Sequence, residues 1–84
     1  MPEVTILYFA QAAELVGCRQ DTLVLSDGSH TEESLISAII ALKPQLKEIE
    51  TDIVLALNES YMTRDHVELN TGDEIAIIPP VSGG

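Results

Sequence analysis

The sequence is poor in basic residues. Four lysines and arginines stand against fourteen aspartates and glutamates among 84 residues, so the formal net charge is -10. This charge disfavours binding to nucleic acids and to anionic membranes, because both carry phosphates of the same sign. It favours a protein partner that presents a basic docking surface.

Cysteine, aromatic residues and long apolar runs are also scarce. Cys18 is the single cysteine, which excludes an intramolecular disulfide, and no run of about 18 apolar residues is present for a transmembrane helix. Aromatic residues make up 4% of the chain against 45% apolar residues, so we expect an aliphatic core in one small domain. The Met1-Pro2-Glu3 start has no secretory pattern, and we expect a cytoplasmic protein.

Motifs for catalysis or for a bound cofactor are absent as well. We find no glycine-rich phosphate loop, no catalytic triad and no paired carboxylate motif. His30 and His66 lie in polar context without a cysteine partner at metal-ligand spacing, so both are interpreted as surface residues. Cys18 can be a nucleophile or a packed thiol. We expect no bound cofactor or metal, and a reactant or carrier rather than an enzyme in its own right.

The first third of the chain predicts two strands around a short helix. Val4–Phe9 alternates as a strand does, and Ala10–Val16 contains helix formers followed by Gly17, which can end a helix. Asp21–Leu25 alternates again, and the turn residues Ser26-Asp27-Gly28 follow it.

A longer amphipathic helix is predicted next. Ser29 or Thr31 can cap its start, and Ser29 with Glu32 matches a capping box. Pro44 ends it. Its apolar face contains Leu35, Ile36, Ile39, Ile40 and Leu42, and Leu46 and Ile49 can add an irregular turn.

The remaining residues predict a hairpin and a final strand. Ile53–Asn58 is a strand that Asn58-Glu59-Ser60 turns toward Tyr61 and Met62, and Val67 and Leu69 anchor the polar stretch Thr63–Asn70. Thr71-Gly72-Asp73 then turns into the strand Glu74–Ile78. Strands on both sides of one long helix predict an α+β roll, with that helix on one face of a mixed sheet.

Alternation divides the strand residues between two faces. The helix-facing set is Val4, Ile6, Tyr8, Ile75 and Ile77, which leaves Leu7, Phe9, Ala76 and Ile78 on the other face. That second face is more apolar than a solvated surface needs to be. Phe9, Ile78 and Tyr61 can form a docking patch there. Alternatively, the short helix or a loop covers these residues.

The C-terminal stretch is suited to being threaded into a partner. Pro79 and Pro80 stop the last strand, and Val81, Ser82, Gly83 and Gly84 follow. Glycines without Cβ atoms can pass through a narrow channel, and four residues reach at most roughly 14 Å. We therefore divide the chain into a domain at 1–80 and a tail at 81–84. A frayed terminus or an expression scar is the alternative.

Two blocks carry a resemblance to a known family. They are Tyr8-Phe9-Ala10-Gln11 with Glu14-Leu15-Val16-Gly17, and the block from Gly72-Asp73-Glu74 to Pro79-Pro80-Val81-Ser82-Gly83-Gly84. Together they resemble the small subunit of molybdopterin synthase, a family with the ubiquitin-like β-grasp fold.

The resemblance implies a role for each residue of the tail. Gly84 would be adenylated by an ATP-dependent, ubiquitin-activating-like enzyme and converted by a sulfur donor to a thiocarboxylate. Gly83 and Ser82 would be threaded into the large subunit, supported by Pro79, Pro80 and Val81, and the sulfur would pass to cyclic pyranopterin monophosphate. Phe9, Tyr61 and Ile78 would contact the large subunit, in a heterotetramer of two small and two large subunits.

The sequence differs from the family at one position, and three other functions stay open. Many bacterial members carry Arg where Ala13 stands, so a contact made by that Arg is missing or supplied elsewhere. A sulfur carrier for thiamine synthesis would use the same tail, and a ubiquitin-like modifier would attach Gly84 to lysines. A non-covalent adaptor would need neither terminal glycine.

Overall fold

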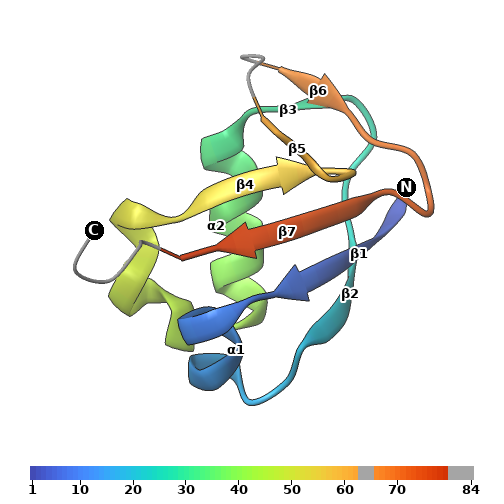
Figure 1. Ribbon diagram of the computed structural model, residues 1–84. Helices are drawn as coiled ribbons and strands as arrows, with labels where there is room; N and C mark the ends of the chain where they lie inside the picture. The colour runs from blue at the N-terminus through green and yellow to red at the C-terminus, as the bar shows by residue number, and fades with distance from the viewer. Residues whose placement is uncertain (63–65, 80–84) are drawn as a thin grey trace.

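The computed structural model describes residues 1–62 and 66–79, in which one mixed sheet packs on one main helix. The five-stranded sheet has the order β2-β1-β7-β4-β5. Its strands are β1 (Glu3–Tyr8), β2 (Gln20–Val24), β4 (Val54–Leu57), β5 (Ser60–Tyr61) and β7 (Glu74–Ile78). Figure 1 shows α2 (Glu32–Leu42) behind this sheet, which confirms the predicted α+β arrangement.

The centre of the sheet is the parallel pair formed by β1 and β7. Their register pairs Ile6 with Ile75 and Tyr8 with Ile77, while the other three neighbouring pairs are antiparallel. Because the two strands run in the same direction, Phe9 and Pro79 follow them at the same edge of the sheet. This pairing places Phe9 and Ile78, two of the expected docking residues, beside Pro79.

The helix-facing side chains form the core as alternation predicts. Val4, Ile6, Tyr8, Ile75 and Ile77 are all buried, and they pack with Leu35 and Ile39 of α2. Each fully buried aliphatic side chain contributes about 1.5–3 kcal/mol to folding. Leu42 was predicted to join this face and does not, since it is 36% exposed. The 3₁₀ helix η1 (Pro44–Asp52) supplies the buried Leu46 and Ile49 instead.

A short helix and a separate two-stranded sheet complete the fold of the described residues. Helix α1 (Ala10–Val16) ends at Gly17, whose left-handed φ of 85° lets its N–H donate to the Ala13 carbonyl at 2.8 Å, as predicted. β3 (Ser29–His30) and β6 (Val67–Glu68) form a separate two-stranded sheet that the sequence analysis did not predict. Val67 packs against the core and Leu69 is buried, which confirms both as anchors.

The start of α2 corrects the predicted capping box. Thr31 is the N-cap: its Oγ1 accepts from the Ser34 N–H at 3.0 Å, and the Ser34 Oγ accepts from the Thr31 N–H at 2.9 Å. Ser29 cannot take this role because it pairs with Glu68 in the small sheet. Glu32, the other half of the predicted box, accepts a hydrogen bond from the Leu55 N–H at 3.4 Å.

The outer edge of the sheet is β2, where backbone groups face away from β1. Backbone hydrogen bonds join Tyr8 to Arg19 and Leu25 to Pro2, and hydrogen-bonded pairs alternate with non-hydrogen-bonded pairs along an antiparallel ladder. Thr5 and Thr22 form a non-hydrogen-bonded pair, so the Thr22 N–H faces away from β1. It donates to Asp21 Oδ1 at 3.0 Å.

In the described ranges, no helix is long and apolar enough to cross a membrane.

We expect Thr31→Ala to lower the free energy of unfolding by about 1 kcal/mol, because the Ser34 N–H loses its side-chain acceptor. Urea denaturation followed by circular dichroism would measure the change. Ser37→Ala, at an exposed position inside α2, is the matched control and is expected to be nearly neutral. Equal losses in the two variants would contradict a capping role for Thr31.

Candidate functional site

The face of the sheet opposite α2 carries a groove with an alanine floor. Leu7 pairs with Ala76 across β1 and β7, and Ala76 pairs with Ala56 across β7 and β4. The two small side chains leave space between larger neighbours, and the resulting hollow has a volume of about 280 Å³. We call it the outer groove. Its lining residues are Leu7, Phe9, Ala56, Glu59, Glu74, Ala76 and Ile78.

One end of the outer groove is apolar. Phe9 is 49% exposed there, and Val54, which pairs with Ile78, is 43% exposed. Figure 1 is viewed onto this face, and neither α1 nor α2 lies over β1, β7 and β4. Among the described residues, the alternative in which the short helix covers this patch is therefore wrong, and docking of a partner at the patch stays a prediction.

The other end of the outer groove is acidic. Glu74 begins β7, and Glu59 lies in the two-residue turn that joins β4 to β5. The Glu74 N–H is held at 2.9 Å by the side-chain oxygen of Asn58, the other residue of that turn. This hydrogen bond fixes the turn beside the start of β7, so both glutamates line the same hollow.

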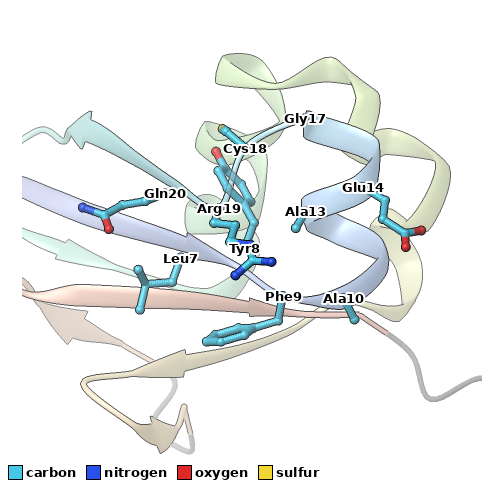
Figure 2. A pocket seen from close by; sticks show the side chains of 10 residues that line it. All are labelled: Leu7, Tyr8, Phe9, Ala10, Ala13, Glu14, Gly17, Cys18, Arg19 and Gln20. Carbon is cyan, nitrogen blue, oxygen red and sulfur yellow. The ribbon is translucent and has the colours of Figure 1, made fainter.

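A second hollow lies beside α1 and shares Leu7 and Phe9 with the outer groove (Figure 2). It is wider, about 760 Å³, and Ala13, Cys18 and Arg19 are among its lining residues. In Figure 2 the Arg19 side chain extends over the end of β1 toward Phe9. A cation is therefore available on the hollow that Ala13 lines. Cys18 is half-buried and packs against the core, as expected of a packed thiol.

Asp21 connects β2 with Tyr8 of β1 and with Lys43 at the end of α2. Its Oδ2 accepts a hydrogen bond from the Tyr8 hydroxyl at 3.4 Å and lies 3.4 Å from Lys43 Nζ. Burial of Tyr8 raises the pKa of its hydroxyl well above the usual value, and the negative charge of Asp21 raises it further. Tyr8 is therefore a neutral hydrogen-bond donor at physiological pH.

The described residues include no group of three histidine, cysteine, aspartate or glutamate side chains placed to hold a metal ion. His66 is exposed, while His30 is partly buried, and its Nε2 lies 2.9 Å from the Ser26 carbonyl. That contact gives His30 a local role at the turn before β3.

The structure places some of the predicted site residues and not others. Phe9 and Ile78 line the outer groove, and Pro79 is buried at the end of β7. Tyr61 belongs to β5, which pairs it with Ala56, and its side chain is not described. The other predicted site residues, Pro80, Val81, Ser82, Gly83 and Gly84, lie outside the described residues.

Sequence reasoning missed the β4 side of the groove and its acidic end. Val54 and Ala56 alternate with Leu55 and Leu57, so the strand pattern could have assigned them to the outer face. No local signal places Glu59 next to Glu74, because their proximity depends on the pairing of β4 with β7.

A parallel central strand pair, flanking antiparallel strands and one packed helix define a ubiquitin-like β-grasp protein, a class to which the structural neighbours belong. The model of the ThiS family matches residues 6–84, and the chain belongs to that family. It is 45% identical to the molybdopterin synthase sulfur carrier subunit of Chlamydomonas reinhardtii, over 98% of this chain and 99% of that protein.

Two solved structures share the fold along almost the whole chain. SAMP1 from Haloferax volcanii superimposes with a TM-score of 0.76 at 28% identity, over 98% of this chain and 99% of that one. The other comes from a complex of subunits 1 and 2 of the molybdopterin-converting factor of Helicobacter pylori. It has a TM-score of 0.69 at 27% identity, with coverage of 98% and 99%.

The raised pKa of Tyr8 predicts a loss of stability in alkali. The folded state favours the neutral hydroxyl, so this contribution is complete below the usual tyrosine pKa near 10 and declines as the pH rises above it. In the original protein the free energy of unfolding should fall by up to about 1.4 kcal/mol per pH unit because of Tyr8, and in Tyr8→Phe this part of the fall should be absent. Urea denaturation between about pH 9 and 11.5 would measure it.

The comparison between the two proteins isolates Tyr8. Lys43 and Asp21 are present in both proteins, so the difference between the two pH profiles reports the Tyr8 hydroxyl. If the free energy of unfolding depends on pH in the same way in the original protein and in Tyr8→Phe, burial does not raise the pKa of the Tyr8 hydroxyl.

Proposed function

We propose that this chain is the sulfur carrier subunit of a molybdopterin synthase and that it carries sulfur as a thiocarboxylate on Gly84. The observation that carries the proposal is the similarity to sulfur carrier subunits over nearly the whole length of both proteins. The family match extends to Gly84 and so includes the terminal Gly-Gly. The open groove that leads to Pro79 agrees with it.

Charging of Gly84 requires two steps, an adenylyl transfer followed by an acyl transfer. The carboxylate first attacks the α-phosphate of ATP on a ubiquitin-activating-like enzyme, which forms an acyl adenylate and releases pyrophosphate. Hydrosulfide released by a sulfur donor then attacks the acyl carbon, the bond to AMP breaks, and a thiocarboxylate forms. Adenylation is needed because the free carboxylate is a poor electrophile, whereas AMP is a good leaving group. ATP belongs to the activating enzyme, and this chain needs no bound cofactor.

Discharge takes place in the large subunit, where the active site of the transferase is expected. Ser82 and Gly83 thread into it, and Pro79, Pro80 and Val81 hold the tail extended at its root. The thiocarboxylate sulfur bonds to cyclic pyranopterin monophosphate, and water then cleaves the bond between the acyl carbon and the sulfur, which leaves a carboxylate on Gly84. Two such transfers complete the dithiolene. The spent carboxylate chain must then dissociate to be recharged.

The apolar end of the outer groove is the proposed contact with the large subunit. Phe9 and Ile78 line the groove, and Pro79 follows Ile78 directly, so docking there brings the start of the tail to the large subunit. The Helicobacter pylori structure is a complex of two such subunits, which supports a large-subunit partner. We propose an assembly of two small and two large subunits.

A ubiquitin-like protein modifier is the second candidate function. The observation that favours it is the similarity to SAMP1, a small archaeal modifier protein. Both functions need the adenylate of Gly84 and differ in the acceptor, which is a lysine amine for the modifier. A sulfur carrier for thiamine synthesis differs from the first proposal only in the final acceptor.

Intact mass spectrometry tests the carrier chemistry. Incubation with the activating enzyme, ATP and a sulfur donor is expected to add the mass difference between sulfur and one carboxylate oxygen. Addition of the large subunit and its pterin precursor should reverse the gain. Charging without discharge would favour another acceptor, and no charging by an active enzyme would contradict the carrier function.

Removal of Gly84 is expected to abolish charging and leave the thermal midpoint unchanged, because the final residue of a tail adds little burial. Mass spectrometry and thermal denaturation of the same sample would measure both quantities. A truncated protein that unfolds would contradict the division between domain and tail.

We expect Phe9→Ala to weaken binding of the large subunit more than tenfold, because an exposed aromatic side chain that is buried on binding commonly dominates affinity. Isothermal titration calorimetry would measure the dissociation constant. Val24→Ala is the matched control, since Val24 is 53% exposed on β2 outside the groove. Equal affinities for the two variants would contradict docking at Phe9.

A further inference from the structure

The two ends of the outer groove differ in chemistry, since one is apolar and the other is acidic. Ile78 lies at the apolar end and Glu74 at the acidic end of the same strand, four residues apart and on the same face. At about 3.3 Å per residue the two ends are separated by roughly 13 Å. A segment lying in the groove therefore meets carboxylates at one end and Phe9 at the other.

Glu59 holds its place at the acidic end in an unfavourable backbone conformation. Asn58 and Glu59 have φ values of 48° and 73° and form the two central positions of the turn between Leu57 and Ser60. Two positive φ values define a type I′ turn, whose second central position favours glycine. A glutamate there is strained, and it keeps a carboxylate on the groove at a cost in stability.

The two ends of the groove are complementary to different side chains of a bound segment. Small side chains at Ala56 and Ala76 leave room for one apolar side chain, and the carboxylates of Glu59 and Glu74 require a positive charge close to it. A second copy of this chain fits poorly, because each copy carries a net charge of -10. A basic protein segment is complementary in both charge and shape.

We infer that the outer groove receives a segment of the large subunit with an apolar side chain over Ala56 and Ala76 and a lysine or arginine against Glu59 and Glu74. The inference rests on the proposed function, in which this groove docks the large subunit. The charged contact sets the direction of the segment, and the apolar contact supplies most of the affinity. Glu59 thus determines specificity from a turn position that favours glycine.

Titration calorimetry with the large subunit from the same organism tests the charged contact. We expect the double variant Glu59→Gln, Glu74→Gln to bind about three- to thirtyfold more weakly at low salt and to show a flatter salt dependence. Glu33→Gln is the matched control, because Glu33 is an exposed glutamate in the first turn of α2, behind the sheet. It should bind within twofold of the original protein.

Glu59→Gly separates stability from binding. We expect it to raise the melting temperature by roughly 2–8 °C while weakening binding as much as Glu59→Gln does. Glu59→Gln keeps the strained backbone and should leave the melting temperature unchanged. A stabilised Glu59→Gly variant with full affinity would overturn the specificity role of Glu59.

The outcomes distinguish this inference from the function on which it rests. If Phe9→Ala weakens binding and the double glutamine variant does not, the groove docks the large subunit without a cation, and the inference is overturned while the proposed function stands. If neither change affects binding, docking in the groove fails as well. Self-association of the original protein that Phe9→Ala abolishes, measured by sedimentation, would identify a second copy as the occupant and would also overturn the inference.

Discussion

The parallel pairing of β1 with β7 is the constraint on which the rest of the structure depends. It joins segments about seventy positions apart and places Ile6, Tyr8, Ile75 and Ile77 on one face, where α2 covers them. The same alternation forces Leu7, Phe9, Ala76 and Ile78 onto the opposite face. The core and the outer groove are therefore two sides of one register, and a one-residue slip would exchange them.

Local patterns predicted what depends on neighbouring residues alone. The helix-facing set, the end of α1 at Gly17 and the end of α2 before Pro44 all follow from periodicity and torsional preference, and the structure has each of them. Capping failed as a local prediction. Ser29 satisfies the sequence pattern as well as Thr31 does, and only its pairing with Glu68 excludes it.

The site was predictable to the same degree and for the same reason. Phe9 and Ile78 follow from alternation along single strands, whereas the alanine floor and the acidic end require knowledge of which strands are adjacent. Leu42 shows the converse error. Helical spacing assigns it to the apolar face, but periodicity carries no information about where the 3₁₀ helix η1 takes over the core.

Asp21 has a consequence at the free edge of the sheet. An exposed edge strand is a template on which other chains can add strands, and natural proteins protect such edges. The Oδ1 of Asp21 already occupies the Thr22 N–H, and its Oδ2 is held by Tyr8 and Lys43. An incoming strand would have to displace a carboxylate fixed from two sides and accept its negative charge. The residue that connects β1, β2 and α2 thereby also occupies one of the backbone N–H groups that β2 would offer to an added strand.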